Sequence, residues 1–599
     1  MSAEGRDSPL EERAPEKPTS SDLVPKWGSD AIAAMLRATG VPYVALNPGA
    51  SFRGLHDSLV NFLGNERPEI LLCLHEEHAV SLAHGYAKVR GEPLAAILHS
   101  NVGLMHASMA VYNAWCDRVP ILLIGATGPV DAARRRPWID WIHTSADQAA
   151  MIRSFVKWDD QPASLPATVE SLARAWQVTR TAPCGPVYVC LDVSVQESAI
   201  KDGETATLPD LARVQPPPIP GLTGRVVEEA AAALLGASRP VILAGRVSRN
   251  IEDWHRRIDL AERLGARVIT DLKAGAAFPT GHPLHVPGPG FFLSADAKRV
   301  LAEADCVLSL DWIDLAGTLQ QAIRGATPAK VVAASVDHTL HNGWSKDHYG
   351  LAPVDTWLAT TPDSAVAILL ESLPAKRFHK PAPATSAAQA RPSPAGTLSL
   401  ADLGRQLRAA IQGDPACLVR LPLGWSGDTW PFSHPLDFLG YDGGAGIGSG
   451  PGMAVGAALA LRGSGRLPVA ILGDGDYLMG VQALWTAARH RIPVLIVVAN
   501  NRSYFNDELH QERVAIARGR DPRNRWIGQR ISDPAPDLAG LARAQGVPAW
   551  GPVTEGSGLE DALRMAVSAV RSGRPAVVDA VVEAEYDETM AAGVVQKVE

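Results

Sequence analysis

The chain of 599 residues has few of the features that mark membrane, secreted or nucleic-acid-binding proteins. Its six cysteines are scattered without metal-site spacing, so we expect free thiols in a reducing cytosol. No apolar run reaches the length of a membrane span and no secretory segment opens the sequence, so we expect a cytoplasmic protein without a membrane partner. The net charge of −8, without a dense basic surface, argues against a nucleic-acid partner.

Length and composition instead indicate a globular protein of several domains. With 46% apolar and 20% charged residues, the chain is too long for one core, and three domains are expected. Apolar strands alternate with helical stretches in residues 26–200, 221–375 and 397–590, which predicts three α/β domains with doubly wound parallel sheets. We predict a disordered leader over 1–25, a Pro/Ala/Ser-rich linker over 376–396 and a polar tail over 591–599.

The run Gly473-Asp474-Gly475-Asp476 is the most informative motif of the chain. It is predicted to form a loop between an apolar strand over 467–472 and a helix over 481–489. A second apolar strand over 492–499 leads to Asn501. Such strands suit a parallel sheet covered on both faces. Ligands of these sheets bind beyond the carboxyl ends of the strands, where both the run and Asn501 are expected.

The residue types at these two strand ends suit a magnesium ion bound to a diphosphate. Asp474 offers a hard carboxylate and Asn501 a neutral amide oxygen, which are ligands that Mg²⁺ accepts. Gly473 and Gly475 let backbone amides come close to phosphate oxygens. The alternative is an ordinary crossover in which the glycines serve only the turn.

The pattern resembles the cofactor motif of the superfamily of decarboxylases and acetolactate synthases that depend on thiamine diphosphate (ThDP). By this resemblance Asp474, the Asn501 side chain and the main-chain oxygen of Ser503 are expected to bind Mg²⁺. Asp476 stands where the family more often has Ser or Ala. An acid there repels a diphosphate unless it points away or caps a helix, so its role in cofactor binding stays open.

The resemblance covers nearly the whole chain and implies its organisation. By this resemblance the first domain is expected to bind the pyrimidine ring of the cofactor and the third its diphosphate, with a central domain between them. In acetolactate synthases the central domain carries FAD, but the flavin-associated loop reads here Ser309–Asp314 without its arginine, so FAD is not expected. The family also implies a homo-oligomer, with a homodimer as the minimum and a homotetramer expected, in which the first domain faces the third domain of the partner.

An activating acid is expected beside the aminopyrimidine ring of the cofactor. The segment 71–80 reads as a strand followed by His75-Glu76-Glu77, with a helix expected from Glu77. It resembles the family's strand, HE and helix, so Glu76 is expected to be both cofactor-binding and catalytic. The alternative is ordinary helix electrostatics, because a glutamate in a first turn stabilises any helix.

A second segment resembles the wedge that holds the cofactor bent. The glycine-rich run 443–448 precedes a helix of small residues. Ile447 matches the bulky aliphatic residue that props the two rings in the family, and Gly446 is placed beside the cofactor with it. Glycines around it permit close approach of the backbone. A core isoleucine in a glycine-rich turn is the alternative.

Other segments resemble those of benzoylformate decarboxylases. Asn47-Pro48-Gly49-Ala50-Ser51 follows the first strand, so Asn47 and Gly49 are expected at the cofactor. Ala50 and Ser51 are expected in the substrate pocket. That group has Ser directly after the glycine, whereas this chain has Ala50 and places Ser51 one position later, which weakens a simple assignment to benzoylformate.

Two histidines and one segment complete the prediction. His99 ends a strand in a Leu-His-Ser triplet like that of the same group, where the histidine transfers protons. His143 matches the region where pyruvate decarboxylases have a histidine pair. Tyr504, Phe505 and Asp507 are expected to shape the substrate pocket, with a solvated surface turn as the alternative.

These features together predict a Mg²⁺/ThDP-dependent lyase that breaks a C–C bond. The favoured substrate is a 2-oxo acid or a related small carbonyl compound, with decarboxylation and, after it, carboligation. The rivals are an acetolactate synthase-type carboligase, a lyase acting on 2-hydroxyacyl thioesters, and a non-catalytic ThDP-binding homologue.

Overall fold

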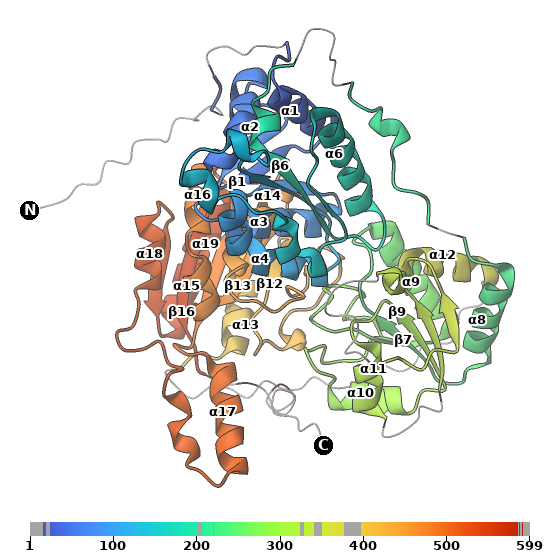
Figure 1. Cartoon of the computed structure of the whole chain (residues 1–599). Helices are drawn as coiled ribbons and strands as arrows, with labels where there is room; N and C mark the ends of the chain where they lie inside the picture. Colours follow the sequence, from blue (N-terminus) through green and yellow to red (C-terminus); the bar gives the residue numbers. More distant parts are fainter. Residues whose placement is uncertain are drawn as a thin grey trace, which may run out of the picture.

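The computed structural model describes residues 16–18, 24–200, 207–219, 221–323, 329–340, 350–375, 397–584, 586 and 590. They form three α/β domains, each around one parallel sheet, which confirms the predicted fold class. The first domain is blue to teal in Figure 1, the second green to yellow and the third orange to red. Most of the predicted leader and all of the predicted linker and tail lie outside the described residues.

The first domain carries a six-stranded sheet in the order β2-β1-β3-β4-β6-β5. Its strands are β1 (Tyr43–Leu46), β2 (Glu69–Leu72), β3 (Leu94–Ile97), β4 (Ile121–Thr127), β5 (Asp159–Asp160) and β6 (Pro186–Asp192). Its helices are α1 (Gly28–Thr39), α2 (Arg53–Asp57), α3 (Glu76–Arg90), α4 (Ser100–Cys116), α5 (Ile139–Ile142), α6 (Leu165–Arg180) and α7 (Val193–Gln196). Helix α3 therefore begins at Glu76, not at Glu77 as predicted, because the His75 side chain caps it by accepting from the amide of Glu77.

The second domain has a five-stranded sheet in the order β11-β10-β9-β7-β8. The strands are β7 (Pro240–Ala244), β8 (Arg267–Ile269), β9 (Cys306–Leu310), β10 (Lys330–Ala334) and β11 (Thr356–Leu358). The helices are α8 (Gly224–Gly236), α9 (Ile251–Leu264), α10 (Ala295–Ala302), α11 (Leu315–Ala322) and α12 (Pro362–Ser372). This domain lies to one side of the other two (Figure 1).

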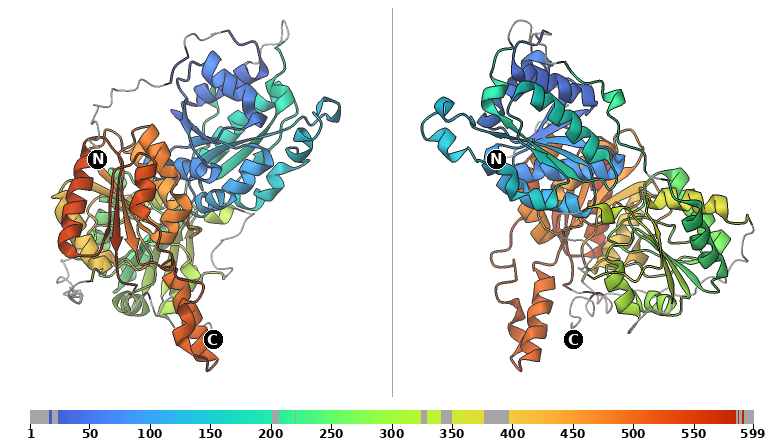
Figure 2. Two further views of the ribbon diagram at one scale, coloured as in Figure 1. Left: turned by 90° about the vertical axis from the view of Figure 1, so that its left-hand side faces the viewer. Right: turned by 45° about the vertical axis from the view of Figure 1, so that its right-hand side comes forward.

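The third domain has a five-stranded sheet in the order β12-β13-β14-β16-β15. The strands are β12 (Ala416–Arg420), β13 (Leu467–Gly473), β14 (Leu495–Asn500), β15 (Ala549–Val553) and β16 (Ala576–Val581). The helices are α13 (Leu400–Ile411), α14 (Gly450–Ala460), α15 (Asp474–Gly480), α16 (Ala483–Arg489), α17 (Phe505–Ala517), α18 (Leu538–Ala544) and α19 (Gly556–Arg571). Helix α17 projects away from the body of the molecule in both views of Figure 2.

The loop predicted for residues 473–476 is wrong, because a helix follows β13 directly. Gly473 is the N-cap of α15, and Asp474 is its first residue. The acidic side chains of Asp474 and Asp476 fall in the first turn, where the helix dipole favours negative charge. The predicted helix over 481–489 is shortened to α16.

Helices α3 and α14 join the first domain to the third through glycines on both sides of their crossing. A Cβ atom added to Gly85 would lie 2.0 Å from the main-chain oxygen of Met453, and one added to Gly456 would lie 1.9 Å from that of Leu82. Contacts this short leave no room for any side chain. The two helices run in the same direction, since Gly452 approaches His78 while Gly456 approaches Leu82.

Within the part of the chain that the structure describes, no helix combines the length and the apolar character needed to cross a bilayer.

We expect Gly456→Ala to destabilise the protein, because the new methyl group has to separate α14 from the backbone of α3. Overpacking of this kind costs about 1–3 kcal/mol and lowers the unfolding temperature by several degrees. Gly236→Ala, at the end of α8, is the matched control, because no described atom lies within 4 Å of its added Cβ. Calorimetry checks both variants, and equal unfolding temperatures would contradict the role of the crossing.

Candidate active site

The carboxyl ends of β13 and β14 bring the two parts of the acidic motif together. Gly473 pairs with Ala499, so the start of α15 lies beside the segment that begins at Asn500. Arg502 adopts a left-handed backbone conformation, with φ of 57°, which turns the chain back toward β13. The amide of Ser503 donates to Oδ1 of Asn501 at 3.0 Å and stabilises this turn.

Asp474 is a buried acid with one unused oxygen. Asp474 is only 4% exposed, and its Oδ1 accepts a hydrogen bond from the amide of Gly475 at 2.9 Å. Oδ2 has no hydrogen-bond partner among the described residues. Burial raises the pKa of Asp474 to about 6, although the amides of Gly475, Arg502 and Ser503 oppose the shift. A buried carboxylate oxygen without a partner is costly unless a cation or a proton occupies the site.

These residues fit the expected cation and its diphosphate. Asp474 supplies a free carboxylate oxygen, and the turn that carries Asn501 and Ser503 adjoins it. No described atom lies within 4 Å of a Cβ added to Gly473, so there is open space at this helix N-terminus. Gly475 is also required for packing, because an added Cβ would lie 2.6 Å from the ring of Tyr504, and its predicted approach to phosphate stays a prediction. The Mg²⁺ ligands Asp474, Asn501 and Ser503 remain a prediction with compatible geometry.

Asp476 points to a different set of partners from Asp474. Its Oδ1 accepts from the amides of Gly448 at 2.6 Å and Gly450 at 3.2 Å. Its Oδ2 pairs with Nε of Arg420 at 2.7 Å. Asp476 therefore caps the start of α14. Helix capping was one of the possibilities left open for this acid, but α14 is a neighbouring helix and not α15, which carries Asp476.

The wedge segment, residues 443–449, lies between the first and third domains. A Cβ added to Gly446 would lie 2.3 Å from the side chain of Met109 on α4, and one added to Gly448 would lie 3.1 Å from Met479. Ile447, between the two glycines, is half-buried. The close approach of Gly446 to α4 is thus a packing requirement as well as the cofactor contact predicted for it.

Glu76 is buried at the first turn of α3 and is paired with a histidine. Its Oε2 lies 3.0 Å from Nδ1 of His106 on α4. His106 stacks on His75 with ring centroids 4.8 Å apart, and its side chain is 49% exposed. Within the described residues, no hydrogen bond or ion pair joins Glu76 to Asp474. Glu76 bonds within the first domain and Asp474 within the third.

The predicted residues around the first strand form a second cluster. Ser51 Oγ and His99 Nδ1 are hydrogen-bonded at 2.9 Å, and the rings of His99 and His143 meet edge to face with centroids 4.7 Å apart. Burial and the neighbouring His143 lower the pKa of His99. A Cβ added to Gly49 would lie 2.4 Å from the Cβ of His99, so this position has to be glycine. The contact between Ser51 and His99 could not be predicted from the sequence, because the two residues are far apart in it. The parallel pairing of β1 with β3 brings them together.

The other predicted residues of the first domain support this arrangement. The Asn47 side chain donates to the main-chain oxygen of Cys73 at 3.0 Å and so ties the end of β1 to the end of β2. Ala50 and Ser51 lie in a short 3₁₀ helix, Ala50–Phe52. This turn explains how Ser51, one position later than expected, still reaches His99.

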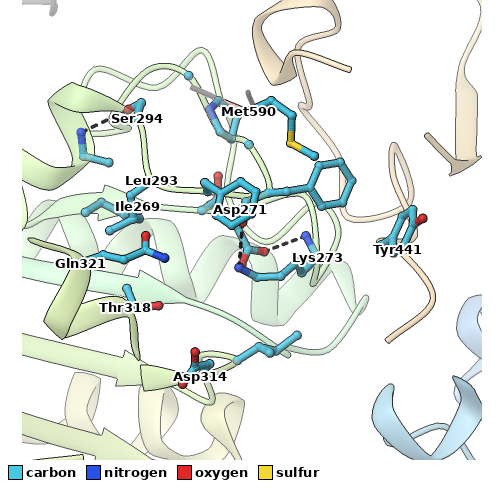
Figure 3. A pocket seen from close by; sticks show the side chains of 18 of the residues that line it. Ile269, Asp271, Lys273, Leu293, Ser294, Asp314, Thr318, Gln321, Tyr441 and Met590 are labelled. Carbon is cyan, nitrogen blue, oxygen red and sulfur yellow. Dashed lines mark hydrogen bonds and ion pairs between the residues drawn. The ribbon is translucent and has the colours of Figure 1, made fainter. Parts of the chain in front are cut away.

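A pocket of about 490 Å³ lies between the second and third domains (Figure 3). Lys273 and Asp271 pair in its wall, with Nζ and Oδ2 3.1 Å apart. The pocket reaches the wedge segment, whose Gly443 and Ala445 line it. The segment after Asn501 contributes Asn506 and His510, whereas Tyr504, Phe505 and Asp507 do not line this pocket. These three residues lie at the start of α17, and their contact with substrate stays a prediction.

Sequence reasoning missed His106, Arg420 and Asp442. His106 lies on α4 and meets Glu76 only because α4 packs beside α3, which no local pattern indicates. Arg420 and Asp442 carry no local signal. Arg420 meets Asp476 because β12 pairs with β13, and Asp442 joins the pair through Arg420.

Comparison with known proteins identifies related chains. Three family models match, described as the N-terminal TPP binding domain, the central domain and the C-terminal TPP binding domain of thiamine pyrophosphate enzymes, over residues 26–151, 227–340 and 423–580. The chain is 24% identical to the acetolactate synthase isozyme 1 large subunit of Escherichia coli, with 80% of this chain and 82% of that protein covered. It is 25% identical to the benzoylformate decarboxylase of Pseudomonas aeruginosa, with 90% and 96% covered.

The fold is also that of solved ThDP enzymes. The 4-hydroxybenzoylformate decarboxylase of Rhodococcus jostii superposes with a TM-score of 0.75 over 94% of this chain and 100% of that chain, at 23% identity.

We expect Asp474→Asn to abolish the stabilisation of the protein by ThDP with Mg²⁺, because the neutral amide removes the negative charge that the carboxylate offers to the cation. Ligand at a hundredfold excess over its dissociation constant stabilises a protein by about 2.7 kcal/mol, a shift that thermal unfolding detects. Without ligand, the variant should unfold at the same or a higher temperature, because a buried unpaired charge is removed. The surface variant Asp521→Asn should keep the full shift, and a full shift in Asp474→Asn would contradict the assignment.

Proposed function

Because this chain belongs to the thiamine pyrophosphate enzyme family, we propose that it is a Mg²⁺-dependent lyase that decarboxylates a 2-oxo acid. The observation that carries the proposal is the Ser51–His99 pair beside His143, because these groups can handle a proton next to the substrate. Decarboxylase and acetolactate synthase relatives are both found at low identity. The choice between decarboxylation and carboligation is therefore argued from the site and not from the relatives.

Glu76 is proposed as the activating acid. It is buried, lies at the N-terminus of α3 and keeps one carboxylate oxygen on His106. The other oxygen is available to hold a proton for the ring nitrogen of an aminopyrimidine. When bound, ThDP supplies the carbon nucleophile and the electron sink for the broken C–C bond. Ile447 is proposed to hold the two cofactor rings at the bend this chemistry needs.

His99 is proposed to transfer the proton that the product carbon needs after CO₂ leaves. Its lowered pKa keeps the ring neutral near pH 7, so Nδ1 and Nε2 can serve as one donor and one acceptor. The Ser51 hydroxyl holds Nδ1 of His99 by a hydrogen bond and so orients the ring. The His143 ring packs edge to face against it.

The main rival is an acetolactate synthase-type carboligase, which the Escherichia coli relative supports. In that reaction a second 2-oxo acid takes the place of the final proton. The Ser51–His99 pair favours protonation, and therefore release of an aldehyde. A thioester lyase and a non-catalytic homologue are the remaining alternatives.

We also propose that the protein is a homo-oligomer and that it is located in the cytoplasm. The bonds of Glu76 and Asp474 run within separate domains, which supports a homodimer in which the first domain meets the third domain of a second copy, and a tetramer of two such dimers. Free cysteines, four of them buried, support the reducing cytoplasm.

A substrate screen tests the reaction class. Purified protein with ThDP and Mg²⁺ is offered pyruvate, branched-chain 2-oxo acids, benzoylformate and a 2-hydroxyacyl thioester, and CO₂ and carbonyl products are measured. We expect CO₂ and an aldehyde from at least one of these 2-oxo acids. Acetolactate formed from pyruvate would favour the carboligase. Cleavage of a 2-hydroxyacyl thioester would favour the thioester lyase. Cofactor binding without turnover of any substrate would favour the non-catalytic homologue.

We expect Glu76→Gln to lower kcat by about 100-fold or more, which is the range for loss of a general acid. Calorimetry should find ThDP binding retained, because the diphosphate site in the third domain is untouched. Asp474→Asn is the reciprocal control, since it should lose binding itself. Turnover at the wild-type rate in Glu76→Gln would refute the role of this acid.

A further inference from the structure

Three buried charged residues form a cluster behind the wedge segment. Arg420 lies at the end of β12, and Asp442 and Asp476 lie on either side of its guanidinium group. Nη1 of Arg420 pairs with Oδ1 of Asp442, and Nε lies 2.7 Å from Oδ2 of Asp476. The guanidinium carbon also stands 4.4 Å from the ring centroid of Tyr441. All three charged residues are buried, so solvent does not screen them.

The remaining oxygens of the two acids bind the wedge segment and the start of α14. Asp476 Oδ1 accepts from the amides of Gly448 and Gly450. Asp442 Oδ2 accepts from the hydroxyl of Ser449 at 3.0 Å. Each acid therefore has one oxygen on Arg420 and one on the backbone or side chains of residues 448–450.

Asn113 holds the other side of the wedge segment from the first domain. Its amide oxygen accepts from the amide of Gly446, and its nitrogen donates to the main-chain oxygen of Gly446, both at 3.4 Å. The same nitrogen donates to Ser449 Oγ at 3.1 Å. Ile447 thus stands between two anchored glycines, Gly446 on Asn113 and Gly448 on Asp476.

We propose that Asp476 is a positioning residue that acts through Arg420 and the amides of Gly448 and Gly450 to hold Ile447 in place, and that it is not a ligand of the diphosphate. The proposal deepens the function proposed above and rests on ThDP being the cofactor. Both carboxylate oxygens of Asp476 are already engaged, which leaves none to meet a phosphate. Asp474, two residues earlier, differs in this respect, because its Oδ2 is free.

Contact with the diphosphate and positioning of Ile447 are two possible roles of Asp476, and they predict different results for pyrophosphate binding. If the carboxylate faced the diphosphate, removing its charge would relieve repulsion and tighten binding of Mg²⁺-pyrophosphate. If it positions Ile447, pyrophosphate has no rings for Ile447 to touch, and its affinity stays unchanged. ThDP does carry the rings, so its affinity and kcat fall when the wedge segment moves.

The test is calorimetric titration of the full-length variant Asp476→Asn with Mg²⁺-pyrophosphate and with Mg²⁺-ThDP. We expect the dissociation constant for ThDP to rise about tenfold or more and that for pyrophosphate to stay within about twofold of wild type. Asp363→Asn is the matched control, because Asp363 also pairs with a buried arginine, Arg257, in the second domain. It should lower the unfolding temperature but leave both affinities within about twofold.

Asn113→Ala tests the same segment without removing a buried charge, and it decides the question if Asp476→Asn does not fold. We expect it to weaken ThDP binding about fivefold, as loss of a neutral hydrogen bond does, and to leave pyrophosphate binding unchanged. Pyrophosphate bound more tightly by Asp476→Asn, or ThDP bound by either folded variant as by wild type, would overturn the proposal. Because these readouts need no substrate, they separate this inference from the proposed decarboxylation, which fails only if no 2-oxo acid is turned over.

Discussion

The close crossing of α3 and α14 is the contact on which the arrangement of the site depends. Gly85 and Gly456 let the backbones touch, and no other residue fits at either position. Because the two helices run in the same direction, their N-termini lie at the same end, where Glu77 and Gly448 approach each other. One N-terminus carries Glu76 and the other carries the wedge segment. A packing constraint between two domains thus places two chemically different segments together.

Two acids in one turn of α15 show how surroundings, and not residue type, decide the role of a side chain. Asp474 has an unpartnered oxygen at the open end of the sheet, and burial raises its pKa. Asp476 has every oxygen paired and sits beneath α14. Arg420 supplies a cation beside the second acid, whereas the first acid keeps an oxygen for the proposed Mg²⁺. The same short motif therefore offers one acid to the proposed cofactor and uses the other to support a neighbouring helix.

The first domain contributes the cluster of Ser51, His99 and His143, which is built from segments far apart in sequence. Ser51, His99 and His143 come from three different connections of one sheet, and they meet because β1, β3 and β4 are neighbours in it. Gly49 makes the approach to His99 feasible. The cluster lies in the same domain as Glu76, whereas Asp474, Asn501 and Ser503 lie in the third domain. The proposed site therefore draws on two domains.

The sequence by itself determined the three α/β domains, the strands of the acidic motif and the candidates Glu76, Asp474 and Asn501. The domains and strands follow from hydrophobic periodicity, and the three candidate residues follow from short motifs and their resemblance to those of a family. Only the tertiary structure decided the direction of Asp476, the pairing of Glu76 with His106 and the helix that replaces the predicted loop at residues 473–476. Each of these depends on partners brought close by strand pairing or helix packing, and no spacing within a single sequence encodes which distant groups will face one another.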